Sequence, residues 1–143
     1  MSKIDNQELL KALENDNNSN IINLTNSIIK NMKNDVIQKL QLKRDEIKEL
    51  HSKLKDYRYI NEINDINYGF YIRWINLKDI DDLNLNRGAF ISEIKITDNG
   101  IVIICKSRFN RHFQIKFDEN LIFQKISPQE QIILKILDAL AHK

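Results

Sequence analysis

Residues 90–107 read FISEIKITDNGIVIICKS, and this stretch decides the fold. Alternating apolar and polar residues precede Asp98-Asn99-Gly100, and a run rich in β-branched residues follows it. An Asn-Gly pair between two such segments is the strongest short-range signal of a β-hairpin. The sequence therefore predicts two antiparallel strands, Phe90 to Thr97 and Ile101 to Ser107.

Three further segments have the composition of strands. Tyr68 to Ile75 is rich in aromatic and β-branched residues, and His112 to Phe117 alternates between polar and apolar. Asp118-Glu119-Asn120 predicts a turn into a last strand, Leu121 to Ile126. Five short strands at this spacing predict a small antiparallel barrel, a fold that leaves few exposed strand edges.

Helical patterns precede the strands. Residues 2–14 combine an S/D-x-x-D/E start with an apolar stripe, which predicts a short helix. Residues 20–57 contain neither Gly nor Pro, and apolar residues recur there at steps of three and four. A helix of this length, roughly 57 Å, would either fold back on the first helix as a hairpin or pair with a second chain as a coiled coil. Its seam is the predicted oligomerisation surface: Ile47, Leu50, Leu54 and Tyr57.

One polar residue interrupts the register of that seam. Lys43 stands where the spacing after Leu40 requires an apolar residue. In a coiled coil such an interruption is typical of a stutter, which changes the local winding of the helix.

The chain ends in a predicted closing helix. Ser127-Pro128-Gln129-Glu130 is a capping box with Pro at the first helical position. The residues expected on the buried face of this helix are Ile132, Ile133, Ile136, Leu137 and Leu140. The fold class is therefore α+β, with a helical hairpin or coiled-coil region over residues 1–60 and a five-stranded antiparallel barrel with its closing helix over residues 61–143.

In strand count and turn placement, residues 66–126 resemble an SH3-like barrel, the fold of Tudor and Sm-like domains. That resemblance implies a binding module, since such modules use aromatic residues to grip methylated side chains or proline-rich peptides. The aromatic face that would serve is Tyr68, Tyr71 and Trp74; alternatively, the same rings fill the core of the barrel. The composition, with 25 Ile, 18 Asn and 16 Lys among 143 residues, resembles that of proteins from large DNA viruses that infect amoebae.

The overall composition excludes several classes of protein. With 42% hydrophobic and 29% charged residues and a net charge of +2, the chain has a typical globular balance. Three glycines leave no room for a glycine-rich nucleotide fingerprint, and a single cysteine excludes a multi-thiolate metal site. Neither a secretory signal nor a membrane-spanning run occurs, so we expect an intracellular protein of the cytoplasm, the nucleus, or a viral factory or virion.

An enzymatic role has one candidate pair. A turn centred on Arg108 and Phe109 would make Cys105 and His112 cross-strand neighbours, and a thiol beside an imidazole is the start of a cysteine nucleophile. Cys105 also continues the apolar face of its strand, which favours a place in the core. The acidic group Asp79, Asp81 and Asp82 lacks the glycine and glutamate of a calcium loop. We therefore predict a non-enzymatic protein without a metal site or a cofactor.

The most informative stretch for binding runs from Asn99 to Phe117 and contains no acidic residue before position 118. It carries Lys106, Arg108, Phe109, Arg111 and Lys116. Basic side chains can neutralise phosphates, and exposed aromatic rings can stack on unpaired bases. Alternatively, these basic side chains belong to a solvated hairpin and form ion pairs with Glu93, Asp118 or Glu119.

Two hypotheses about function follow. The first is an adaptor that acts through protein–protein contacts and forms a homo-oligomer through its long helix. The second is a DNA- or RNA-binding protein that uses the basic hairpin of residues 99–117.

Overall fold

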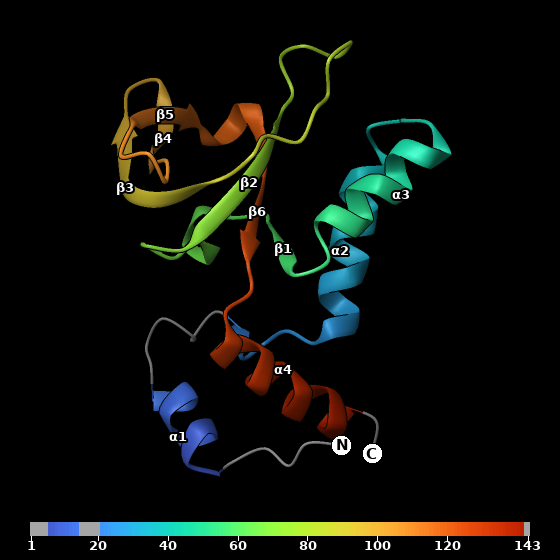
Figure 1. The fold of residues 1–143 in the computed structure, drawn as a ribbon, viewed down its shortest axis with the longest axis vertical. Helices are drawn as coiled ribbons and strands as arrows, with labels where there is room; N and C mark the ends of the chain where they lie inside the picture. Colours follow the sequence, from blue (N-terminus) through green and yellow to red (C-terminus); the bar gives the residue numbers. More distant parts are fainter. Residues whose placement is uncertain (1–5, 15–20, 142–143) are drawn as a thin grey trace.

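The computed structural model describes residues 6–14 and 21–141, which form an α+β fold (Figure 1). The helices are α1 (Asn6–Glu14), α2 (Asn26–Gln38), α3 (Arg44–Lys53) and α4 (Pro128–Ala141). The strands are β1 (Tyr57–Ile60), β2 (Tyr71–Asn76), β3 (Ala89–Thr97), β4 (Gly100–Lys106), β5 (His112–Lys116) and β6 (Asn120–Lys125). Two 3₁₀ turns lie between strands: η2 (Ile63–Asp65) follows β1, and η3 (Phe117–Glu119) joins β5 to β6.

All six strands form one antiparallel sheet in the order β1-β6-β2-β3-β4-β5. The predicted hairpin of β3 and β4 is confirmed, since Thr97 pairs with Gly100 across the turn. The φ angle of Gly100 is +111°, a conformation that favours glycine.

The sheet is strongly curled but open. The rings of Trp74 in β2 and Phe113 in β5 have centroids 5.5 Å apart, although these strands are three positions apart and would be separated by roughly 14 Å in a flat sheet. The predicted closed barrel of five strands is nevertheless wrong. Tyr57–Ile60, expected at the end of a helix, forms a sixth strand beside β6, and no ladder among the described residues joins β5 to β1.

The predicted single helix over residues 20–57 is also wrong. It is divided into α2 and α3, and Gln41 between them has a φ of 54°, in the left-handed region. Backbone bonds from Leu40 to Ile37 (3.1 Å) and from Gln41 to Gln38 (3.2 Å) tighten the end of α2. The register interruption at Lys43 therefore marks the start of a new helix and not a stutter in a continuous one.

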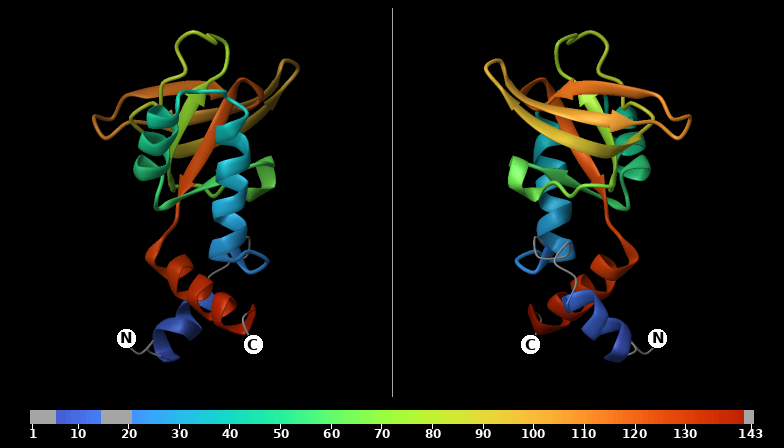
Figure 2. Two further views of the ribbon diagram at one scale, coloured as in Figure 1. Left: turned by 90° about the vertical axis from the view of Figure 1, so that its right-hand side faces the viewer. Right: turned by 90° about the vertical axis from the view of Figure 1, so that its left-hand side faces the viewer.

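The hairpin between the first helix and the long helix, one of the two arrangements left open by the sequence, is not confirmed. α1 packs against α4, at the end of the molecule opposite the β3–β5 part of the sheet (Figure 2). In the described residues there is neither a hairpin between α1 and a long helix nor a long coiled-coil helix.

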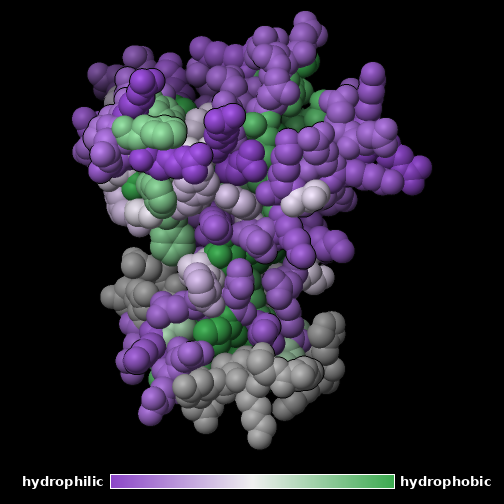
Figure 3. All heavy atoms as spheres, viewed as in Figure 1, coloured by the Kyte–Doolittle hydropathy of each residue, from purple (hydrophilic) through white to green (hydrophobic). Residues whose placement is uncertain are grey.

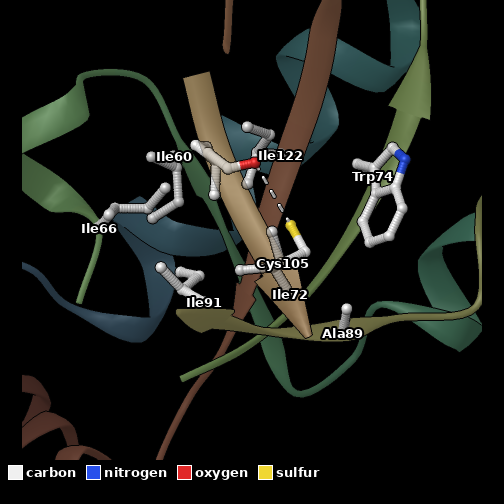
Figure 4. Close-up of a cluster of buried hydrophobic side chains, with 9 residues drawn as sticks. Ile60, Ile66, Ile72, Trp74, Ala89, Ile91, Cys105 and Ile122 are labelled. Carbon is white, nitrogen blue, oxygen red and sulfur yellow. Dashed lines mark hydrogen bonds between the residues drawn. The ribbon is translucent and has the colours of Figure 1, made fainter. Parts of the chain in front are cut away.

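The two faces of the sheet carry separate cores. The inner face, enclosed by the curl, contributes Ile60, Ile72, Trp74, Ile91, Ile103, Cys105 and Ile122 to one cluster (Figure 4). The outer face is covered by α2 and α3 over β1, β6 and β2, where Ile37, Leu50, Leu54, Tyr57, Ile75 and Phe123 form a second cluster. Beyond these helices the outer face of β2–β5 is not covered by any helix of the described chain (Figure 1).

The capping box that begins α4 is confirmed. Ser127 N–H donates to Glu130 Oε1 (2.9 Å), and Glu130 N–H donates to Ser127 Oγ (3.1 Å). On the buried face of α4, Ile133 is buried as predicted, but Leu140 is 58% exposed and Leu134 is buried in its place. The buried face thus ends one turn earlier than the sequence pattern predicts. None of the helices in the described part of the chain is long and apolar enough to cross a membrane.

Candidate nucleic-acid interface

The turn between β4 and β5 presents a cation and a ring to solvent. Ser107 Oγ accepts hydrogen bonds from the backbone N–H groups of Phe109 (3.3 Å) and Arg111 (3.2 Å), and Asn110 adopts a φ of 61°. This polar scaffold leaves Phe109 74% exposed, with Arg108 Cζ 5.5 Å from the centroid of its ring. The contact is a cation–π interaction, which holds both groups at the tip of the hairpin.

A row of aromatic and cationic residues crosses four strands on the outer face. Tyr71 pairs with Phe90, Phe90 with Lys106, and Lys106 with His112. Residues paired in this way point to the same face of a sheet and are neighbours along one line. We call these four residues the outer row; it is roughly 14 Å long, three spacings between strands.

The aromatic half of the outer row is an ordered pair. The rings of Tyr71 and Phe90 meet edge to face with centroids 5.0 Å apart, and Phe90 is 44% exposed. Towards β1 the line continues to Lys125 and Tyr57, because Gln124 pairs with Ile72 and Lys125 pairs with Tyr57. Rings and positive charges therefore follow each other across all six strands of the sheet.

A hollow of about 440 Å³ lies beside the outer row. Its walls combine three rings with three guanidinium groups, those of Tyr57, Tyr71, Phe109, Arg73, Arg87 and Arg108. We call it the aromatic–arginine hollow. None of the described residues that line it is acidic, so the three positive charges are available to a ligand.

Local contacts fix two of the side chains in this hollow. Arg73 Nε donates to the backbone oxygen of Asn86 (2.9 Å), which ties β2 to the loop that carries Arg87. Burial raises the pKa of Tyr57, and the charge of Arg73 only partly opposes that shift. The Tyr57 hydroxyl is therefore protonated at neutral pH and can donate a hydrogen bond.

No protein-family model, curated protein or solved structure matches this chain. The interpretation of this surface therefore rests on its own geometry and charge.

The structure brings together part of the predicted basic hairpin. Lys106, Arg108 and Phe109 lie in the outer row or beside it, and Arg111 is exposed in the same turn. Lys116 lies at the other end of β5, where its Nζ is 3.8 Å from Glu119 Oε1. Lys116 therefore forms an ion pair with Glu119, which is one of the pairings considered above as an alternative to phosphate binding.

The three residues of the predicted aromatic face, Tyr68, Tyr71 and Trp74, do not lie on one surface. Trp74 lies in the inner core and Tyr71 on the outer face, since neighbouring rungs of a strand alternate between faces. Tyr68 lies in the turn before β2 and is 60% exposed. Of the three, only Tyr71 belongs to the candidate interface.

The predicted oligomerisation seam packs within the chain. Leu50, Leu54 and Tyr57 are buried in the outer-face cluster, and Ile47 is half-buried against it. The chain's own sheet therefore covers the apolar surface from which self-association was predicted. Self-association by another route stays a prediction.

Cys105 and His112 do not form the cross-strand pair considered from the sequence. Cys105 pairs with Phe113 and His112 with Lys106, so the thiol and the imidazole point to opposite faces of the sheet. Burial raises the pKa of Cys105 to about 12, and its Sγ contacts the Ile103 carbonyl oxygen at 3.8 Å (Figure 4). The thiol is a core group at neutral pH. Among the described residues, no group of three His, Cys, Asp or Glu is placed to hold a metal ion, the aspartates at 79, 81 and 82 included.

Sequence reasoning missed four residues of the interface: Arg73, Arg87, Phe90 and Lys125. The sequence pattern indicates only that Phe90 begins a strand and that Arg73 lies within another. The available signal was the spacing of Tyr71 and Arg73, which are two residues apart in a strand and therefore share a face. The approach of Arg87 to Arg108 depends on a loop contact that no sequence pattern encodes.

Proposed function

We propose that the protein binds single-stranded nucleic acid on the outer face of β2–β5. The observation that carries this proposal is the outer row of Tyr71, Phe90, Lys106 and His112, which leads into the aromatic–arginine hollow. Rings on such a sheet surface stack on bases, and cations between them contact the phosphates that join those bases.

The arrangement favours single strands over duplexes. A ring can stack on a base only when the base is free of its own neighbours, and Phe90, Phe109 and His112 are exposed rings of this surface. The net charge of +2 supplies little long-range attraction, so binding depends on the local cluster of Arg73, Arg87 and Arg108.

Fluorescence anisotropy with labelled 12-nucleotide DNA and RNA strands, and with the matching duplexes, tests the proposal. We expect the single strands to bind at low salt, to bind more weakly as salt rises, and to outcompete the duplexes. Absence of single-strand binding at low salt would falsify the proposal.

Charge-reversal variants locate the site. Arg87→Glu with Arg108→Glu removes two exposed cations and lowers the dependence of log K on log salt by about 1.4, since each phosphate contact on a single strand contributes about 0.7. Lys39→Glu with Lys135→Glu changes the net charge equally at exposed positions outside the interface and serves as the matched control. Equal loss of binding in both pairs would place the contact elsewhere.

A stacking variant tests the rings separately from the charges. Phe90→Ala removes a 44% exposed ring that pairs with Tyr71 and is expected to weaken binding by about 1–3 kcal/mol without changing the salt dependence. Ile96→Ala, on the same strand and 85% exposed, is its control and should bind like the wild type.

A second candidate is the protein–protein adaptor. Hydrophobic residues reach the surface around α4 (Figure 3), and Leu10, Leu13 and Leu140 are exposed on α1 and α4. Such a patch is a candidate contact surface for a second copy of the chain. Leu10→Asp with Leu140→Asp should then reduce the particle mass in light scattering, whereas a wild-type mass of 17.0 kDa contradicts self-association.

A further inference from the structure

A second hollow is lined by residues of α2, of the end of α3 and of the segment that joins β6 to α4. These elements lie on the helical side of the molecule (Figure 1). The volume of the hollow is about 600 Å³. Four basic side chains and three amides line it: Lys30, Lys33, His51, Lys55, Asn26, Asn31 and Asn34. We call it the lysine hollow. The described lining residues include no carboxylate.

Lys33 is the anchored member of this group. Only 7% of it is exposed, and its Nζ donates to the backbone oxygens of Leu54 (2.9 Å) and Lys55 (3.4 Å). These bonds attach the end of α3 to α2 and hold His51 and Lys55 beside the ammonium. An ammonium has three N–H donors, so one remains for a ligand.

The positive charges in the lysine hollow repel one another. Burial lowers the pKa of Lys33, an effect that Asp56 opposes and Lys30 reinforces. Burial also lowers the pKa of His51, and the charges of Lys33 and Lys30 lower it further. The carboxylate of Asp138 on α4 is engaged by the backbone (2.9 Å) and side-chain (2.6 Å) nitrogens of Asn26 at the rim. Asp56 and Asp138 thus lie near the hollow, but the residues that line it are basic, amide or apolar, and none of those described is acidic.

We propose that the lysine hollow binds a polyphosphate group. A single carboxylate or phosphate would leave most of this charge unpaired and most of the volume empty, whereas a chain of phosphates can reach Lys30, Lys33 and Lys55 together. The apolar side chains of Ile29 and Ile126 form the remaining wall. The group can be carried by a free polyphosphate or nucleotide, or by the phosphorylated end of a nucleic acid.

Calorimetric titration with tripolyphosphate tests the site directly. We expect binding to wild-type protein and at least a tenfold loss in Lys30→Gln with Lys55→Gln, two exposed lysines whose replacement leaves Lys33 and its bonds in place. Lys39→Gln with Lys135→Gln is the charge-matched control and should bind like the wild type. No binding, or equal loss in the two variant pairs, overturns the proposal.

The titration of His51 gives a second readout. Bound tripolyphosphate adds negative charge beside the imidazole and should raise the pKa of His51, as followed by NMR, so binding should tighten as the pH falls through that pKa. An unchanged His51 titration in saturating tripolyphosphate contradicts a ligand in this hollow.

Oligonucleotides with a 5′-triphosphate or a 5′-hydroxyl end distinguish the two sources. Tighter binding of the triphosphate strand, lost in Lys30→Gln with Lys55→Gln, assigns the site to a nucleic-acid end; tripolyphosphate binding without that gain assigns it to a free ligand. Either result supports the site. The 5′-hydroxyl strand reports on the outer row alone, so failure of one surface is distinguishable from failure of the other.

Discussion

Gly88 controls the position of a ring in the candidate interface. A Cβ at this residue would overlap the ring of Tyr71, although the backbone of Gly88 is not in the left-handed region. Gly88→Ala should therefore leave the sheet intact and push Tyr71 out of the outer row, which weakens single-strand binding several-fold in anisotropy titrations.

A double-mutant cycle checks that the effect of Gly88→Ala passes through Tyr71. In a Tyr71→Ala background the added methyl group has no ring to displace, so it should change binding little. Additive losses in the double variant would show that Gly88 acts through another contact.

Glu130 makes stability depend on pH. It is fully buried, and burial raises its pKa although Ser127 and the charge of Arg58 oppose the shift. The folded state therefore binds this proton more tightly than the unfolded state, and the free energy of unfolding falls as the pH rises through the raised pKa. Glu130→Gln keeps an oxygen for the Ser127 N–H and removes the charge, so urea unfolding at pH 5 and pH 7.5 should show a smaller pH dependence than in the wild type. An unchanged dependence, as expected for the exposed control Glu46→Gln, contradicts this role.

At the scale of elements, the turn between α2 and α3 depends on one strained residue. Gln41 has a φ of 54°, which a β-branched side chain strongly disfavours. Gln41→Val should lower the free energy of unfolding by about 1–2 kcal/mol, whereas Gln41→Gly, which tolerates this angle, should not. Equal stability of the two variants in urea unfolding would contradict the strain.

Local patterns predicted the elements that depend on local contacts. Asp98-Asn99-Gly100 encodes its turn within three residues, and Ser127 and Glu130 bond to each other across one helical turn. The break between α2 and α3 at Gln41 could not be predicted in this way, because no Gly or Pro stands there in the sequence. Tyr57–Ile60 follows Leu54 at helical spacing and becomes a strand because β6, more than 60 residues further along the chain, pairs with it.

The candidate site shows the same limit. Arg108 and Phe109 were predicted because they are adjacent in one basic turn. Their approach to Tyr71, Arg73 and Arg87 is set by the order β2-β3-β4, which sequence spacing alone does not specify.

At the scale of the whole molecule, the apolar residues at the end of α3 can serve either as part of the core of a monomer or as the contact surface of a dimer. Leu54 is fully buried among α2, α3 and the sheet. Leu54→Asp should place an unpaired charge there and lower the free energy of unfolding by more than about 3 kcal/mol, seen as loss of cooperative thermal unfolding. A folded 17.0 kDa monomer derived from a larger wild-type particle would instead show that Leu54 serves self-association.

The place of β6 in the sheet has a consequence for biosynthesis. β6 is the last strand in the sequence, yet it lies between β1 and β2 and pairs with both of them. On a ribosome that adds 5–20 residues per second, roughly 3–13 s pass between the synthesis of Ile60, the end of β1, and that of Lys125, the end of β6. During that interval two strand edges stay open to other nascent chains. The sheet can therefore close these edges only after residues 120–125 have been made and inserted between strands that were synthesised first.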